Sequence, residues 1–148
     1  MKSKLIVLSV MLALFIISGC GKKDNQKFAG VYSVTDDWKS SKTALGNGSL
    51  EYDMTVVPDG DEGTDVLLMN VNKTFNSVKA TVEGDNITVN SQITTNISGT
   101  KYKINGYTGK LKDNKLDLKF VYSDALYSDA VGEVECSISG TKPKSSKN

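Results

Sequence analysis

The sequence predicts an all-β protein that folds as a closed or partly open barrel of about eight antiparallel strands connected as a meander. Three observations lead to this prediction. From residue 28 onward, apolar and polar residues alternate with a period of two, which is typical of strands with one buried face. Short segments rich in glycine, asparagine and aspartate separate the alternating runs. No segment has the apolar periodicity of a helix long enough to cover a sheet. A sandwich of two packed sheets is the alternative.

Residues 1–19 have the organisation of a bacterial lipoprotein signal peptide. A basic start precedes an apolar run at residues 5–17, which is shorter than the roughly 20 apolar residues that a transmembrane helix needs. Small residues then lead directly to Cys20, which resembles the lipobox, where the chain is cut before a cysteine whose sulfur takes a lipid. We therefore expect lipidation of Cys20. An ordinary secretory signal, which would leave Cys20 free to pair with Cys136, is the alternative.

The resemblance to bacterial lipoproteins implies a location and a division of the chain. Acyl chains such as palmitate on Cys20 would attach the mature protein stably to a membrane, because two or more chains suffice for anchoring. Gly21 follows where aspartate would indicate inner-membrane retention, so we expect the outer membrane, with the domain facing the periplasm or the cell surface. We expect residues 20–27 to comprise the lipidated cysteine and a flexible tether. Residues 28–142 should form a single domain, and residues 143–148 should form a disordered tail.

The first half of the domain alternates in segments separated by polar turns. Residues 37–48 are polar and predict a loop, which contains the chain's single tryptophan, Trp38. Pro58 ends an alternating run, and residues 59–65 form an acidic, glycine-containing turn after it. The strands predicted here are residues 28–34, 50–56, 66–71 and 78–82.

The second half continues the pattern with one irregularity. Residues 83–86 and 112–115 have the composition of tight hairpin turns. The alternation changes phase at Gly106, which predicts a β-bulge or a strand bend there. Residues 123–130 predict a longer connection with one helical turn capped by Ser123. The strands predicted here are residues 87–93, 102–111, 116–122 and 133–138.

The composition excludes several functions. Without the two lysines of the signal peptide, 16 of the 18 basic residues remain against 17 acidic ones, so we expect no nucleic-acid partner. The chain has no histidine and every basic residue is lysine. The commonest general base and metal ligand is therefore missing. Cys136 lies between polar neighbours in an alternating strand, so we expect its thiol to be a buried apolar group rather than a nucleophile.

The strands also resemble a known family. The opening segment from Phe28 to Thr35 is similar to the first strand of small Bacteroidetes lipoproteins with a lipocalin-like (calycin-type) barrel. Later hairpins and the closing strand of that family resemble residues 78–92, 106–111 and 136–142. Several relatives have a cysteine after the first strand that could bridge to the closing strand, whereas this chain has Asp37 and Trp38 in that neighbourhood. The resemblance implies a fold and no settled activity.

Two groups of side chains are candidate binding sites. Asp59, Asp61 and Asp65 lie on a glycine-flexed loop and could offer oxygen ligands to calcium, although an exposed, solubilising loop is the alternative. The segment Tyr-Ser-Asp-Ala occurs twice, at residues 122–125 and 127–130. Its tyrosines and aspartates could bind a polar ligand at a barrel rim, or the segment could simply join two strands. This candidate ligand site comprises Trp38, Tyr122, Asp124, Tyr127 and Asp129.

Paired carboxylates could in principle hydrolyse glycosides, but Asp36 and Asp37 are adjacent and point to opposite faces if the strand continues. We therefore expect a non-enzymatic, membrane-anchored module without a cofactor, which binds a small apolar or amphipathic ligand. A structural or assembly component of the cell envelope that binds another protein is the alternative. Trp38 would plug one end of the core or serve as a binding anchor. Five inward-facing side chains could fill a narrow barrel, namely Leu116, Leu118, Phe120, Val134 and Ile138.

Overall fold

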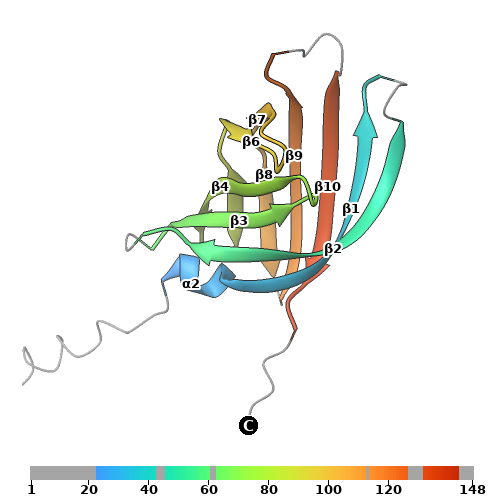
Figure 1. Ribbon diagram of the computed structural model, residues 1–148. Helices are drawn as coiled ribbons and strands as arrows, with labels where there is room; N and C mark the ends of the chain where they lie inside the picture. Colours follow the sequence, from blue (N-terminus) through green and yellow to red (C-terminus); the bar gives the residue numbers. More distant parts are fainter. Residues whose placement is uncertain (1–22, 43–45, 61–62, 113, 127–131, 144–148) are drawn as a thin grey trace, which may run out of the picture.

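The computed structural model describes residues 23–42, 46–60, 63–112, 114–126 and 132–143, and shows an all-β protein (Figure 1). Its elements are one short helix, α2 (Asp24–Phe28), and the strands β1 (Gly30–Ser40), β2 (Asn47–Pro58), β3 (Asp65–Val71), β4 (Phe75–Glu83), β5 (Asn86–Val89), β6 (Gln92–Thr95), β7 (Lys101–Asn105), β8 (Thr108–Lys112), β9 (Lys115–Asp124) and β10 (Glu133–Thr141). Cys20 and the rest of the proposed leader lie outside the described residues.

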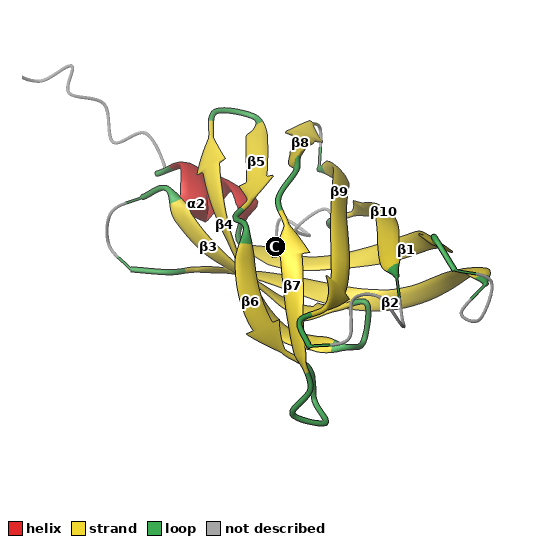
Figure 2. Ribbon diagram, turned by 90° about the horizontal axis from the view of Figure 1, so that it is seen from above, coloured by secondary structure: helices red, strands yellow, loops and turns green. Residues whose placement is uncertain are grey.

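Eight of the strands form a closed antiparallel barrel, which confirms the predicted fold class. The hydrogen-bonded order is β10-β1-β2-β3-β4-β5-β8-β9, and β9 pairs with β10 to close the sheet. Strands β6 and β7 form a hairpin (Figure 2), and β7 pairs with β9 on the same edge as β8 but at the other end of β9. Consecutive strands pair from β1 to β5 and from β8 to β10, and β5 pairs with β8 across the intervening hairpin of β6 and β7. The meander prediction therefore holds and the sandwich alternative is wrong.

The two extra strands are continuations of two predicted strands. Ile87 pairs with Gly109 in the β5–β8 ladder, and Ile93 pairs with Lys103 in the β6–β7 ladder, so both ladders keep one common register. They are therefore two parts of a single long hairpin whose arms were predicted as residues 87–93 and 102–111. The β5–β8 part lines the wall at one end of the barrel and the β6–β7 part at the other.

The predicted irregularity at Gly106 is a β-bulge. Strand β9 pairs with both β7 and β8, and Asn105 faces Val121 while Lys110 faces Asp117. Five steps along β7 and β8 therefore correspond to four along β9, which leaves one extra residue around Gly106. The phase change in the sequence indicated this feature correctly.

A side-chain amide replaces ladder hydrogen bonds where β4 and β6 meet. The Gln92 side chain accepts a hydrogen bond from the Lys79 backbone N–H at 3.0 Å and donates to the Lys79 carbonyl at 2.9 Å. It also donates to the Asn90 carbonyl at 2.8 Å. The Thr94 hydroxyl donates to the Ser77 carbonyl nearby, at 3.0 Å. Side chains thus close a junction at which β4 and β6 form no ladder among the described residues, and an isolated bridge joins Phe75 to Asn96 just after β6.

We expect Gln92→Ala to lower the free energy of unfolding by about 1 kcal/mol, because it removes three hydrogen bonds whose backbone partners are partly accessible to water. Amide hydrogen exchange of Lys79 should accelerate in the same variant. Thr95→Ala, at an exposed position on the same strand, is the control and should change neither quantity. Unchanged exchange at Lys79 in Gln92→Ala would show that the amide contributes nothing to this junction.

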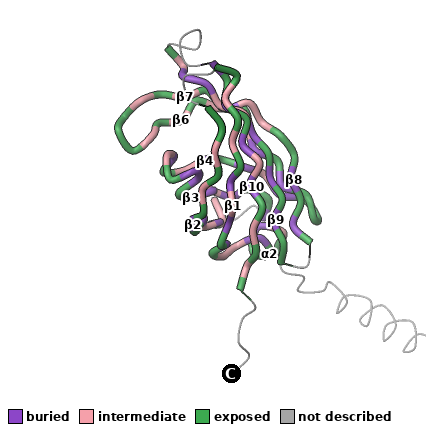
Figure 3. The backbone as a smooth tube through the Cα atoms, turned by 90° about the vertical axis from the view of Figure 1, so that its right-hand side faces the viewer, coloured by how far each residue is buried: buried purple, intermediate pink, exposed green. Residues whose placement is uncertain are grey.

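Apolar side chains fill the interior of the barrel. Figure 3 marks the buried positions along the backbone of the strands. All five residues of the predicted inward-facing set are buried at 1 % exposure. The largest fully buried side chains are Tyr32, Phe28, Phe75, Phe120, Met54, Leu68, Ile87, Ile104, Leu116, Leu118, Ile138 and Val56. As expected for a narrow barrel of eight strands, side chains occupy most of the space inside it.

Helix α2 covers one end of the barrel, which we call the closed end. Phe28 is fully buried there, and the Tyr32 hydroxyl donates a hydrogen bond to the Phe28 carbonyl at 2.7 Å. The Asn25 backbone N–H donates to the Gly63 carbonyl at 2.9 Å, which ties the helix to the connection between β2 and β3. The chain also leaves β10 toward this end (Figure 1).

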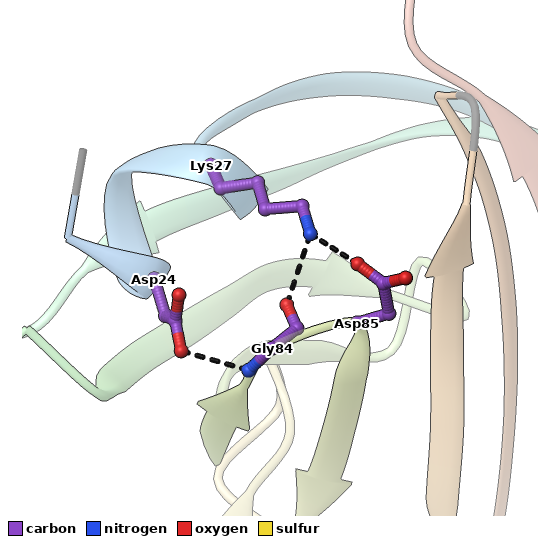
Figure 4. Close-up of polar contacts among 4 residues, drawn as sticks. All are labelled: Asp24, Lys27, Gly84 and Asp85. Atoms are coloured by element: carbon purple, nitrogen blue, oxygen red, sulfur yellow. Dashed lines mark hydrogen bonds and ion pairs between the residues drawn. The ribbon is translucent and has the colours of Figure 1, made fainter. Parts of the chain in front are cut away.

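Polar contacts fix α2 against the β4–β5 turn (Figure 4). The Asp24 carboxylate accepts a hydrogen bond from the Gly84 backbone N–H at 2.7 Å. The Lys27 ammonium donates to the Gly84 carbonyl at 3.1 Å and forms an ion pair with Asp85. The Asp24 charge in the first turn and the Lys27 charge in the last turn also suit the helix dipole. Residues 24–27, predicted as part of a flexible tether, are therefore ordered on the closed end.

Two other predicted boundaries are wrong. Residues 37–40 and 47–48 belong to β1 and β2 rather than to a loop, because the inward alternation of β1 continues through Trp38. Ser123 and Asp124 end strand β9 and are both buried, so Ser123 does not cap a helical turn.

Candidate functional site

Four connections lie at the other end of the barrel, which we call the open end: β1–β2, β3–β4, β6–β7 and β9–β10. Aromatic side chains gather inside this end. The Phe75 ring packs edge-to-face against Tyr102 and Tyr122, with centroid distances of 5.4 Å and 5.1 Å. The rings of Tyr102 and Tyr122 meet at 5.6 Å in the same geometry. Trp38 and Leu50 are partly buried against the core on neighbouring strands.

Asp36 is a buried carboxyl in this apolar setting. It follows Tyr32 and Val34 on the inward face of β1, and the next side chain, Asp37, is on the outward face. Its side chain has no exposure, and neither carboxyl oxygen has a hydrogen-bond partner of good geometry among the described residues. Burial raises the pKa of Asp36 to about 6. The Cys136 thiol and the Tyr52 hydroxyl lower this pKa, while the Asp37 charge raises it.

Asn72 inserts into the same region from the β3–β4 turn. Its backbone has a φ of 53°, and Asn70 and Lys73 beside it are also left-handed, which is a strained arrangement for residues other than glycine. The Asn72 backbone N–H donates to the Tyr52 hydroxyl at 2.8 Å. The side-chain Nδ2 lies at the long distances of 3.5 Å from the Tyr122 hydroxyl and 3.9 Å from the Cys136 sulfur. The backbone of this turn is thus held more firmly than its side chain.

Cys136 is fully buried and free, as the sequence analysis expects of a small core group. Burial raises the pKa of its thiol, and the neighbouring Asp36 charge raises it further. A thiol with a raised pKa is a poor nucleophile. We name the polar residues that meet here the open-end cluster: Asp36, Tyr52, Asn72, Tyr122 and Cys136. Chemically, this cluster can accept hydrogen bonds or a positive charge at Asp36.

The structure brings together part of the predicted ligand site. Trp38 on β1 and Tyr122 on β9 both belong to the open end, and Trp38 lies opposite Cys136 in the β1–β10 ladder. Asp124 is the last residue of β9 and is buried, and its carboxylate accepts a hydrogen bond from the Leu126 backbone N–H at 2.8 Å. Tyr127 and Asp129 lie outside the described residues.

The predicted calcium loop is a separate feature at the closed end. It connects β2 to β3 as expected, and the Asp59 backbone N–H donates to the Asp65 carbonyl at 2.9 Å. Asp61 lies outside the described residues, so calcium binding stays a prediction. Within the described ranges, no group of three or more acidic, cysteine or histidine side chains is positioned to hold a metal ion.

Four members of the open-end cluster were absent from the predicted site: Asp36, Tyr52, Asn72 and Cys136, the last of which was predicted only as a buried apolar group. Asp36 carries a signal in the sequence, because it occupies an inward position between Val34 and Trp38 where an apolar residue is expected. Tyr52 looks like an ordinary core residue, and the position of Asn72 depends on its left-handed turn. Neither could be identified from the pattern alone.

Trp38 borders a hollow of 620 Å³ on the outside of the wall. Its other lining side chains belong to outward positions and include Asp37, Lys39, Lys119 and Glu135. These charges are mixed in sign, as on an ordinary solvated sheet face. The packing of Trp38 is explained by Gly48 opposite it, where an added Cβ would approach the indole ring within 2.4 Å. Glycine at position 48 thus makes room for the indole ring.

We expect Tyr52→Phe to lower the free energy of unfolding by about 1–3 kcal/mol, because the Asn72 backbone N–H would lose its acceptor in a buried place. The matched control is Tyr107→Phe, which removes a hydroxyl from a half-exposed ring. Denaturant unfolding of both variants measures the difference. Equal stability of the two variants would mean that the turn does not depend on the Tyr52 hydroxyl.

No family model matches this chain, and no curated protein is similar to it. Within the part of the chain that the structure describes, no helix combines the length and apolarity required to cross a bilayer.

Proposed function

We propose that the protein is a lipid-anchored, non-catalytic binding module of the bacterial cell envelope, attached to the outer membrane through Cys20. Its open end would bind a small apolar or amphipathic ligand. The observation that carries this proposal is the open-end cluster, in which a buried carboxyl without a firm hydrogen-bond partner lies among aromatic side chains. Natural cores rarely contain such a group, and perturbed buried carboxyls are commonest at functional sites.

The arrangement of the two ends supports the same proposal. The helix that follows the proposed anchor packs on the closed end, where Phe28 fills the interior. The aromatic cluster lies at the opposite end, so a membrane attachment near Cys20 would leave the open end accessible.

A second candidate function is that of an assembly component that binds another envelope protein. It is favoured by apolar side chains exposed on and next to the β6–β7 hairpin. Ile93 is 67 % exposed, Ile97 is 68 % exposed, and Leu126 in the next connection is 73 % exposed. Scattered apolar residues are normal on protein surfaces, so this candidate ranks second.

The anchor is tested by replacing each cysteine separately. We expect Cys20→Ala to lose the acyl mass and to leave the membrane fraction, because no lipid can then be attached. Cys136→Ala is the control and should stay membrane-bound, since Cys136 is buried in the barrel. Intact-protein mass spectrometry and cell fractionation measure both results. Membrane retention of an unmodified Cys20→Ala protein would contradict the proposal.

Native mass spectrometry of the protein purified from its own membrane distinguishes the two functions. A co-purifying small molecule would support a ligand-binding module, and a stoichiometric protein partner would support an assembly component. A monomeric species without added mass, together with no ligand response at the open end, would count against the first function.

A further inference from the structure

Among the described residues, no group that acts on the Asp36 carboxyl supplies a counter-charge. Three groups act on its pKa: Cys136 on the neighbouring strand β10, Asp37 on β1 itself, and Tyr52 on β2. None of these is a cation. The thiol and the phenol can at most donate weak or neutral hydrogen bonds. An ionised carboxylate buried without a positive partner is costly, so a cation from outside the chain would be bound favourably there.

The surroundings of Asp36 suit an organic cation rather than a metal ion. A metal ion would require several oxygen, nitrogen or thiolate ligands, and no such group gathers among the described residues. Aromatic rings instead dominate this end of the barrel, with Tyr52 adjacent to Asp36 and Phe75, Tyr122 and Trp38 on the surrounding strands. The faces of such rings attract ammonium groups and accommodate apolar chains.

A local movement of the β3–β4 turn is the route by which a ligand would reach the buried Asp36. Asn72 belongs to the β3–β4 turn, and its side chain meets the rest of the cluster through Nδ2 contacts that are long. The strained left-handed residues of this turn are typical of segments that change conformation when a ligand binds. Movement of the Asn72 side chain would free the Tyr122 hydroxyl and the Cys136 sulfur, and Cys136 in turn lies next to Asp36.

We propose that Asp36 is the counter-charge for the ammonium head of an amphipathic amine, which enters the open end by displacing the Asn72 side chain and places its apolar part among the aromatic rings. This inference rests on the proposed ligand-binding function and adds the chemical class of the ligand.

The experiment compares three small probes of similar shape: n-butylammonium, 1-butanol and butanoate. The acylated mature protein, solubilised in detergent, is titrated with each probe at pH 7.5 while tryptophan fluorescence and heat are recorded. Trp38 is the chain's single tryptophan and lies at the open end, so its emission reports on this site. Two variants form a matched pair. Asp36→Asn removes the buried carboxyl, and Asp37→Asn removes the same charge from the exposed position next to it.

We expect the wild type and Asp37→Asn to bind n-butylammonium at least about ten-fold more tightly than 1-butanol, because a buried charge pair contributes much more than a neutral contact. Butanoate should bind most weakly. Asp36→Asn should lose the preference for the amine. The preference should also weaken at pH 5, where Asp36 with a pKa of about 6 is largely protonated. Thermal unfolding confirms that both variants are folded.

Two outcomes would overturn the inference in different ways. If all three probes bind equally well and Asp36→Asn behaves like the wild type, the open end binds ligands but Asp36 is not a counter-charge. If no probe changes the Trp38 emission or produces heat, the amine inference fails, and native mass spectrometry then decides independently whether the ligand-binding function survives.

Discussion

Replacing Asp36 with asparagine is expected to stabilise the protein by up to about 3 kcal/mol at pH 7.5, which is the free energy that corresponds to a pKa raised from 3.8 to about 6. The amide has nearly the shape of the carboxyl but carries no charge that burial penalises. A stabilising substitution at a fully buried position is unusual, because most core substitutions destabilise. The result would show that the wild-type protein keeps Asp36 at a cost in stability, as binding sites often do.

The difference in stability between Asp36→Asn and the wild type depends on pH, and its sign follows from the raised pKa of Asp36. The pKa of Asp36 is higher in the folded than in the unfolded state, so the protonated carboxyl stabilises the fold. This contribution is fully present below pH 3.8 and is lost as the pH rises through about 6. The stability advantage of Asp36→Asn should therefore be absent near pH 3.5 and grow to its full size above pH 6.5. Urea unfolding at several pH values measures it.

Asp37→Asn is the control for this prediction, because it removes a neighbouring charge from the exposed face of the same strand. It should change stability by less than about 0.5 kcal/mol at any of these pH values. If Asp36→Asn were less stable than the wild type at pH 7.5, the ionised carboxylate would have to be satisfied inside the barrel, and the argument for a missing counter-charge would fail.

Gly106→Ala is expected to destabilise the protein by about 3 kcal/mol or more, because overpacking that forces the backbone to move is among the costliest single changes. A Cβ at position 106 would lie 1.9 Å from the Val89 carbonyl oxygen and 3.2 Å from the Ser91 backbone nitrogen. These atoms belong to the other arm of the long hairpin and cannot rotate away as a side chain could. The bulge therefore requires glycine for the close approach of two backbones.

The control for Gly106→Ala is Gly99→Ala in the β6–β7 turn. Nothing lies within 4 Å of a Cβ there, but the φ of +86° makes any side chain strained. This variant should lose only about 1 kcal/mol. Chemical denaturation of both variants separates steric overlap from backbone strain. Equal losses would mean that the two arms of the hairpin part easily at the bulge.

Much of the fold could be predicted from the sequence because one face of each strand is buried in a single core. The alternation identified eight strands, and the change of phase at Gly106 located the bulge. The prediction was wrong where polar residues occupy strand positions. Residues 37–40 were assigned to a loop because Asp37 and Lys39 face outward, although Trp38 between them continues the inward face of β1. Helix α2 was missed because five residues are too few for a helical period.

The candidate site was only partly predictable, since it depends on contacts between distant strands. Trp38 and Tyr122 were selected for their residue types, and the structure places both at the open end. Asp36 was considered only as half of a catalytic pair with Asp37, although its phase in the alternation already indicated burial. The insertion of Asn72 depends on left-handed backbone at Asn72 and Lys73 in the turn and at Asn70 near the end of β3, which no periodicity reveals.

The packing of α2 on the closed end has a consequence for where a ligand would come from. If Cys20 carries the lipid, the chain up to Asp24 spans at most about 14 Å, so the covered base of the barrel would stay next to the bilayer. Strand β1, with 11 residues, is about 35 Å long, and because barrel strands tilt by about 40° to the axis, the opposite mouth would stand roughly 25 Å from the lipid surface. Such a receptor would collect its amine from the surrounding aqueous phase rather than extract it from the membrane beneath.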